Sequence, residues 1–282
     1  MIDARSRGRL AATLIVTTII FLLVSAMSVE AGTETARSKA EKIEPIEGQF
    51  FSDGHPIDEY HCVSKAPGEH PVVMLLHGCA PKHFGERDFR QMCIDLAEHG
   101  YYAMFIEYYG AAGAPNCRDL AMTPSVSLAP ETPLPDDVWM RELISARSSL
   151  AYNPRADSSR LGVIGFSFGG TLAVITAALK PNLIDVIVDD YGFSNERVED
   201  TVAKASNFPP TLILQGDADR RAHVTDAIHL HDVIAKRQPA SEIHVYPGVD
   251  HAFNFSDAAG YDADASDDAW SRTVSFLDRH LK

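Results

Sequence analysis

In the stretch "RLGVIGFSFGGTLAV", residues 160–174, an apolar run is followed by one serine, Ser167, that lies between Gly165 and the pair Gly169 and Gly170. Glycine leaves no side chain where backbone segments approach closely, and it adopts backbone angles that other residues avoid. The stretch therefore predicts a sharp, crowded turn with Ser167 at its tip. Residues 165–169 match G-x-S-x-G between a predicted strand and a predicted helix, the context of a nucleophile elbow. The competing interpretation is a glycine-rich strand-to-helix turn without chemistry.

The bulk properties of the chain are those of a soluble globular protein. It has 282 residues, of which 45% are hydrophobic and 23% are charged, so it is long enough to bury a sizeable core. One domain is expected, since a single α/β domain often reaches roughly 250 residues. The formal net charge of −14 and the absence of a Lys/Arg cluster argue against nucleic acid as a partner.

The N-terminal segment differs in composition from the rest of the chain. Three arginines precede the uncharged stretch Leu10–Val29, and small residues follow it, which predicts a signal peptide over residues 1–31. Cleavage would follow Ala26 or Ala31, and the mature protein would be secreted or periplasmic. An uncharged stretch of about 20 residues can also span a bilayer, so an uncleaved membrane anchor is the alternative. A linker, residues 32–47, and one domain, residues 48–282, are expected to follow.

Outside the leader, the sequence alternates between short apolar runs and amphipathic helical patterns. The apolar runs end in turn residues and predict buried parallel strands; they cover residues 71–78, 101–110, 161–166, 183–190, 211–217 and 242–248. Residues 48–52 and 57–65 predict an antiparallel edge. The expected fold class is α/β, with a mostly parallel, doubly wound sheet and helices on both faces.

A serine hydroxyl is a weak nucleophile and needs a base that a third group orients. Asp217 and Asp219 follow one predicted strand, and His251 follows the last one. The order serine, acid, histidine is that of α/β-hydrolases, and the carboxyl ends of parallel strands meet at one sheet edge. His251 could instead be an ordinary surface histidine. The residues alone do not decide between the two aspartates.

An acyl-transfer site also needs donors for the oxyanion and a surface for the substrate. The expected donors are the backbone amides of Phe168, which follows the serine, and of Cys79, in the loop after an earlier strand. Aromatic residues at the same sheet edge predict an apolar pocket for an uncharged acyl or aryl ester; they are Tyr108, Tyr109, Phe168, Tyr191, Phe193 and Phe253. The alternative is that these aromatic side chains belong to the core.

The cysteines all lie in the part of the chain that would be exported, where disulfides persist. They are Cys62, Cys79, Cys93 and Cys117, and three full pairings are possible. One hypothesis joins Cys79 to Cys117, which would tether a proline-rich loop to the predicted oxyanion loop. Cys93 lies on the inner face of an amphipathic helix and is expected to be a buried thiol. Neither the cysteine spacing nor the pair His229 and His231, which do not face each other on a helix, predicts a metal site.

Taken together, the motifs "LLHGCAP", "GFSFGG", "DDYG", "QGDADRRAHV" and "YPGVDHAFNF" resemble the dienelactone hydrolase family of α/β-hydrolases over residues 48–282. The resemblance implies a single-domain hydrolase without a cofactor that acts on a small-molecule ester or lactone. It further implies a triad of Ser167, Asp219 and His251, because the acid of the family lies three residues after the glycine that closes its strand.

The chain departs from the family pattern at three positions. The name-giving enzymes use a cysteine nucleophile where this chain has Ser167, and they carry a glutamate near the oxyanion loop where it reads His77-Gly78-Cys79. Their arginine after the catalytic histidine is matched by Phe255 or a near neighbour. We therefore expect an exported serine hydrolase that cleaves its substrate through an acyl-enzyme. Dienelactone itself is not the expected substrate. A non-catalytic binding protein and a small peptidase of the same fold are the alternatives.

Overall fold

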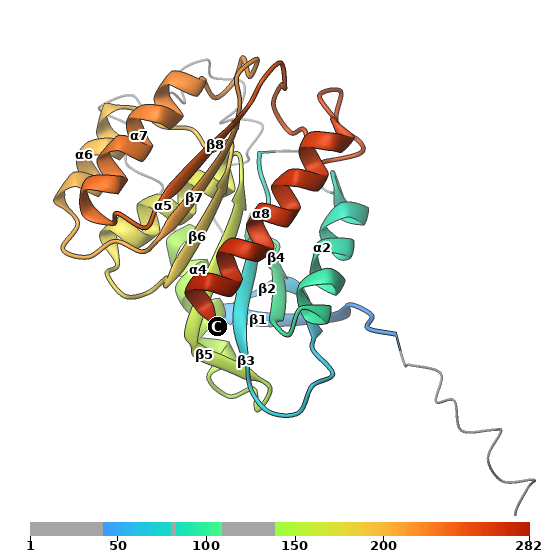
Figure 1. Ribbon diagram of the computed structural model, residues 1–282. Helices are drawn as coiled ribbons and strands as arrows, with labels where there is room; N and C mark the ends of the chain where they lie inside the picture. Colours follow the sequence, from blue (N-terminus) through green and yellow to red (C-terminus); the bar gives the residue numbers. More distant parts are fainter. Residues whose placement is uncertain (1–41, 80–82, 109–138) are drawn as a thin grey trace, which may run out of the picture. The chain divides into compact units, whose positions relative to one another are not determined.

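A mostly parallel sheet is the centre of the computed structural model, which describes residues 42–79, 83–108 and 139–282 (Figure 1). Within these residues the sheet has eight strands in the order β1-β2-β4-β3-β5-β6-β7-β8. The strands are β1 Ile46–Ser52, β2 His55–Val63, β3 His70–Leu76, β4 Tyr102–Ile106, β5 Ala156–Phe166, β6 Val186–Asp190, β7 Thr211–Gly216 and β8 Glu242–Tyr246.

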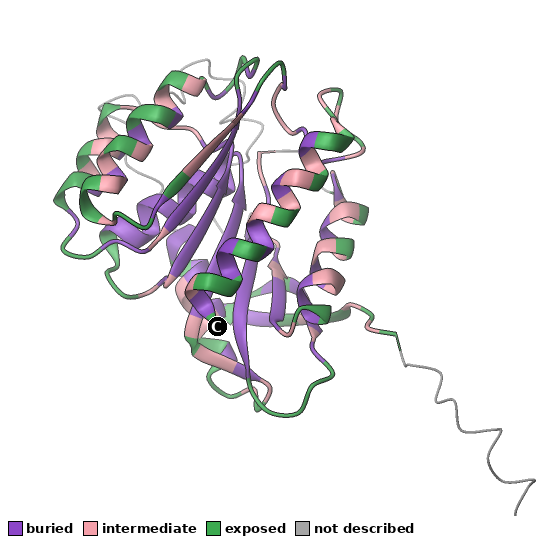
Figure 2. Ribbon diagram, in the orientation of Figure 1, coloured by how far each residue is buried: buried purple, intermediate pink, exposed green. Residues whose placement is uncertain are grey.

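The strand directions agree with the sequence analysis. β3 pairs in parallel with β4 and β5, and β5 to β8 continue in parallel register. β1 and β2 form the antiparallel edge, with β2 also antiparallel to β4. The apolar runs at the middle of the sheet are buried on both faces, as parallel strands covered by helices require (Figure 2). The predicted α/β-hydrolase fold class is confirmed.

Helices cover both faces of the sheet (Figure 1). One core layer joins one face to α4–α7, and the other layer joins the opposite face to α2 and α8. The helices are α2 Glu86–Glu98, α4 Trp139–Leu150, α5 Phe168–Leu179, α6 Glu196–Lys204, α7 Val224–Arg237 and α8 Ala263–Leu281. α5 is buried along almost its whole length, so the helix that starts at the serine turn is held on every side.

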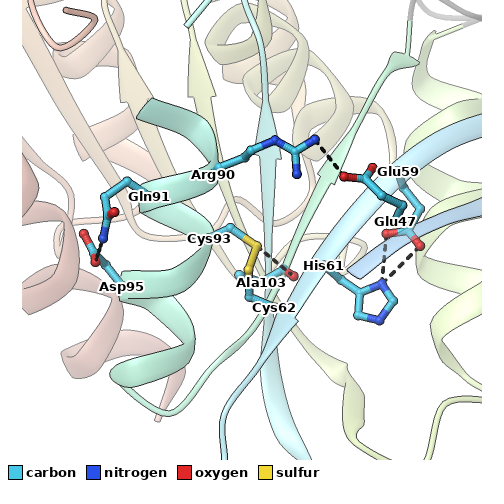
Figure 3. Close-up of a disulfide and its surroundings, with 9 residues drawn as sticks. All are labelled: Glu47, Glu59, His61, Cys62, Arg90, Gln91, Cys93, Asp95 and Ala103. Carbon is cyan, nitrogen blue, oxygen red and sulfur yellow. Dashed lines mark hydrogen bonds and ion pairs between the residues drawn. A yellow bond between two sulfur atoms is a disulfide. The ribbon is translucent and has the colours of Figure 1, made fainter. Parts of the chain in front are cut away.

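A disulfide between Cys62 of β2 and Cys93 of α2 ties the antiparallel edge to the helix that covers it (Figure 3). Both cysteines are fully buried. The expectation that Cys93 is a buried thiol is therefore wrong: it is buried but bonded, because β2 turns Cys62 toward the inner face of α2. None of the cysteines in the described ranges is a free thiol. The hypothetical partner of Cys79, Cys117, lies outside the described residues, so that bridge stays a prediction.

We expect the double variant Cys62→Ala/Cys93→Ala to fold with the same site but to lose about 2–4 kcal/mol of unfolding free energy. The reason is that the bond restricts the unfolded chain across a sequence separation of 31 residues. Urea denaturation of the variant, with reduced and unreduced wild type as references, measures the loss. A variant as stable as the unreduced wild type would show that the bond contributes nothing.

The residues from Ile43 onward form one compact unit. β1 begins at Ile46, two positions inside the expected linker. The proposed leader and most of the linker lie outside the described residues, as does Tyr109 of the expected pocket. Across the described ranges, no helix is both long enough and apolar enough to cross a membrane.

Candidate active site

Ser167 lies in the sharp turn between β5 and α5, with φ 55° and ψ −119°. This left-handed conformation is strained for a residue with a side chain, and such strain persists only where the surroundings hold it. The turn also needs its glycines for close approach. A Cβ on Gly165 would lie 2.4 Å from the carbonyl carbon of Gly169, and one on Gly169 would lie 2.4 Å from the carbonyl oxygen of Leu76. The predicted crowded turn is present, with the serine at its tip.

His251 and Asp219 complete a hydrogen-bonded chain with the serine. Nε2 of His251 lies 2.9 Å from Oγ of Ser167, and Nδ1 lies 2.7 Å from Oδ2 of Asp219. A neutral imidazole that carries its proton on Nδ1 donates to the carboxylate and leaves Nε2 to accept the serine proton. The arrangement has the geometry of a nucleophile, a base and an orienting acid.

The structure places Asp219, and not Asp217, against the histidine. The second carboxylate oxygen of Asp219 accepts the amides of Arg221 and Ala222 at 2.8 and 2.9 Å. Burial by itself raises the pKa of Asp219, but the bond to His251, its charge and these two amides outweigh burial, so the pKa is lower than usual. The carboxylate is therefore ionised at neutral pH and stabilises a proton on the imidazole.

Asp217 stabilises a turn and does not contact the histidine. It is exposed, and its carboxylate accepts the backbone amide of Gly248 at 2.6 Å, which holds the turn after β8 beside the turn after β7. The neighbouring Arg220 does not compete for Asp219: its side chain is 89% exposed and lies 4.0 Å from Asp250.

The loop after β3 lies directly against the serine. A Cβ on Gly78 would come within 3.0 Å of the Cβ and 3.6 Å of the Oγ of Ser167. Cys79 follows this glycine, and Phe168 is the first residue of α5. The two residues expected to supply oxyanion donors are thus on the two segments that flank the serine. The ring of Phe168 packs edge-on against Trp139, with centroids 5.0 Å apart.

His77 supports this loop. Its Nδ1 lies 2.9 Å from the carbonyl oxygen of Gly78, and its Nε2 lies 3.1 Å from the carboxylate of Glu107. The ring of His77 stacks on the ring of Tyr108, with centroids 4.2 Å apart. The hydroxyl of Tyr108 donates to the backbone carbonyl of His77. These contacts fix the loop where the resembled family carries a glutamate.

The expected aromatic pocket is only partly present. Tyr108, Tyr191 and Phe253 are at most 1% exposed, so they are core residues and correct the prediction that they line a pocket. The reason is that their side chains belong to the two core layers, Tyr108 to one and Tyr191 and Phe253 to the other. Phe193 is half-buried, with its ring 5.8 Å from that of His251, and is the described member of the set that keeps exposed surface beside the histidine.

β6 ends in two buried carboxyl groups, to which the sequence motif "DDYG" assigned no role. Asp189 and Asp190 are 1% and 2% exposed. Burial raises the pKa of Asp189 to about 7 against the opposing effect of the Gly192 amide. Burial and the neighbouring Asp189 raise the pKa of Asp190 well above its usual range, with the bond from Asn254 acting in the opposite sense. In the sequence, the only sign of these buried carboxyl groups is a pair of acidic residues at the end of an apolar run.

Asp189→Asn is expected to remove a pH dependence of stability. Because the folded pKa is about 7 and the ordinary value is 3.8, the folded protein binds this proton more tightly than the unfolded chain. The stabilisation is complete below the unfolded pKa and is lost as the pH rises through the folded one. Asparagine can still accept the Gly192 amide, which donates at 2.9 Å. As the pH rises from about 5 to 8, the unfolding free energy of wild type should fall by on the order of 2 kcal/mol from this group, and the variant should not show this loss. Equal pH dependence in the two proteins would contradict this assignment.

Two buried amide side chains that support the hydrogen-bonded chain were not predicted from the sequence. Gln215 donates to Asp219 at 3.2 Å, and Asn254 bonds Asp190 and Tyr191. Buried amides of this kind have no motif, because their role depends on the tertiary fold. Among the described residues, no group of three or more His, Cys, Asp or Glu side chains could hold a metal ion.

Comparison with known proteins places the site in a family context. The family model of the dienelactone hydrolase family matches residues 57–281. A Salmonella typhimurium protein named "Putative carboxymethylenebutenolidase" is 28% identical over 236 residues, which cover 80% of this chain and 84% of the relative. A Bradyrhizobium protein named "Probable 2-oxo-3-(5-oxofuran-2-ylidene)propanoate lactonase" is 28% identical over 199 residues, covering 68% of this chain and 78% of that protein.

A solved structure shares the same fold. A Klebsiella pneumoniae protein, described as a "Putative Dienelactone Hydrolase", superimposes with a TM-score of 0.70 at 24% identity, and the match covers 85% of this chain and 100% of that one.

Proposed function

The chain belongs to the dienelactone hydrolase family, and we propose that within it the protein is a serine hydrolase that cleaves a carboxylic ester or lactone through an acyl-enzyme. The observation that carries the proposal is the continuous chain of hydrogen bonds from Ser167 through His251 to Asp219. A serine at the tip of a strained turn, with a base on its hydroxyl and an ionised acid behind that base, suits nucleophilic attack on a carbonyl carbon.

The proposed reaction has two halves. The Oγ of Ser167 attacks the carbonyl carbon while Nε2 of His251 takes the hydroxyl proton, and Asp219 stabilises the resulting imidazolium. Backbone amides of Phe168 and Cys79 stabilise the negative oxygen of the tetrahedral intermediate. The intermediate expels the alcohol, which receives the proton from His251. Water, deprotonated by the same histidine, then attacks the acyl-serine, and His251 returns the proton to the Oγ of Ser167 as the acid is released.

An uncharged acyl or aryl ester is the proposed substrate class. Phe193 presents a half-buried aromatic surface beside His251, which favours apolar groups. Phe255, which itself or with a near neighbour matches the family's arginine, is 3% exposed and packs against Phe84, Phe89 and Phe166. It supplies no positive charge for a substrate carboxylate, so a dianionic lactone fits less well.

A panel of p-nitrophenyl esters of increasing acyl length, with one uncharged and one carboxylated lactone, tests the proposal. We expect turnover of short aryl esters and slower turnover of the carboxylated lactone. A non-catalytic binding protein would turn over none of them, and a peptidase would prefer acylated amino-acid amides over these esters.

We also propose that the protein acts outside the cytoplasm. The leader pattern of residues 1–31 supports export, and the disulfide between Cys62 and Cys93 suits an oxidising compartment. Mass spectrometry of the protein isolated from its cells should find a shortened N-terminus. An intact chain in the membrane fraction would favour the anchor instead.

A further inference from the structure

Three buried side chains next to the site connect the serine turn to the histidine loop. Asp190 ends β6, Tyr191 follows it, and Asn254 lies three residues after His251. Their exposed fractions are 2%, 1% and 8%. Each hydrogen bond among them that is lost therefore leaves a largely buried polar group without its protein partner, at a cost in free energy.

The contacts form a continuous path. The backbone carbonyl of Asp190 accepts the amide of Ser167 at 2.8 Å, and its carboxyl oxygen accepts Nδ2 of Asn254 at 3.0 Å. The amide oxygen of Asn254 accepts the hydroxyl of Tyr191. The ring of Tyr191 in turn meets the ring of His251 edge-on, with centroids 4.7 Å apart. The serine and the histidine are thus connected twice, once directly and once through this path.

The backbone along the path is held in unfavourable conformations. Tyr191 has φ 46°, and Ala252, which follows the histidine, has φ 61°. A left-handed conformation at residues with a Cβ costs free energy and persists only where the surroundings over-determine it. The hydrogen bonds of Asn254 join the segments that contain these two residues, so they are placed to maintain both turns.

Packing alone does not fix Asn254. Asp190 and Asn254 line a cavity of about 220 Å³ whose other walls come mainly from α2 and α8. The lining of this cavity includes neither Ser167 nor His251. A side chain with open space beside it is oriented by its hydrogen bonds, so removing them frees it to move.

We propose that Asp190, Asn254 and Tyr191 are positioning residues that hold the imidazole of His251 in line with the hydroxyl of Ser167. They act through the histidine and the serine turn and do not contact the substrate. The kinetic consequence rests on the proposed function, whereas the structural consequence, a fixed imidazole, does not.

Tyr191→Phe removes one oxygen atom and tests the path with the least disturbance of packing. We expect kcat for a short aryl ester to fall roughly tenfold to a hundredfold with KM within about twofold, because a small misplacement of the base affects the chemical step. Asn254→Leu should give a similar loss, and the double variant should lose no more than either single one, since both break the same path.

Tyr101→Phe is the matched control. Tyr101 is fully buried in the same core layer, and its hydroxyl donates to Asp278 at 2.6 Å, so the variant also loses one tyrosine hydroxyl hydrogen bond, away from the site. We expect it to lower the melting temperature while leaving kcat unchanged. A merely structural role of Tyr191 would make the two variants alike.

The low-field ¹H NMR signal of the proton between His251 and Asp219 gives a second reading that requires no turnover. We expect Tyr191→Phe and Asn254→Leu to shift or broaden it and Tyr101→Phe to leave it in place. If wild type cleaves no ester, the proposed function fails, and this signal alone decides the positioning proposal. An unchanged signal in both path variants, or additive losses of kcat in the double variant, would overturn it.

Discussion

Ser167→Ala should abolish turnover while leaving the fold intact, with kcat for a short aryl ester lower by at least about a thousandfold. In the proposed mechanism the hydroxyl oxygen forms the acyl-enzyme, and among the described residues no other nucleophile is seen within hydrogen-bond distance of Nε2 of His251. KM should change little, because the serine contributes mainly to the transition state. Progress curves at high enzyme concentration measure the residual rate.

The control for this variant is its melting temperature. Ser167 is 8% exposed and occupies a strained conformation, so alanine should have little effect on stability. Turnover close to that of wild type in a folded Ser167→Ala protein would reject the serine as nucleophile.

Asp219→Asn should be folded but nearly inactive, with a loss of several orders of magnitude in kcat. Asparagine cannot accept the Nδ1 proton of His251 through its amide nitrogen, and it no longer stabilises the imidazolium, so the histidine can adopt the wrong tautomer. The backbone amides of Arg221 and Ala222 can still bond the asparagine oxygen, which keeps the loop in place. Steady-state kinetics and circular dichroism separate the two effects.

Asp217→Asn is the matched variant two residues away. Its carboxylate accepts only the amide of Gly248 among the described contacts, so we expect full activity and a loss of about 1 kcal/mol of stability. The reverse pattern, with Asp217→Asn inactive and Asp219→Asn active, would mean that the acid was assigned to the wrong aspartate.

The serine turn could be predicted because its signal is local. A G-x-S-x-G pattern between an apolar run and a helix requires only neighbouring residues, and in the structure α5 begins at Phe168, directly after the serine. The strand runs were also local signals. β5 nevertheless begins at Ala156, five residues before the apolar run, since its first part pairs with β3 across a shift in register.

The parts that could not be predicted depend on which faces the elements present to one another. The pairing of Cys62 with Cys93 required knowing that α2 covers the inner side of β2. The sequence did not show whether the aromatic residues near the sheet edge line a pocket or belong to the core. Their burial in the structure distinguishes Phe193, which is half-buried, from Tyr191 and Phe253, which are buried. The distinction between Asp217 and Asp219 came only from family spacing, because both follow the same strand.

The central claim is that Ser167 carries the acyl group, and the most direct measurement is covalent labelling with a fluorophosphonate probe followed by peptide mass spectrometry. We expect one adduct, on the peptide that contains Ser167, formed quickly in wild type, slowly in Asp219→Asn and not at all in Ser167→Ala. An unlabelled Ser167 in a protein that still hydrolyses esters, or an adduct on another residue that accounts for the lost activity, would contradict it.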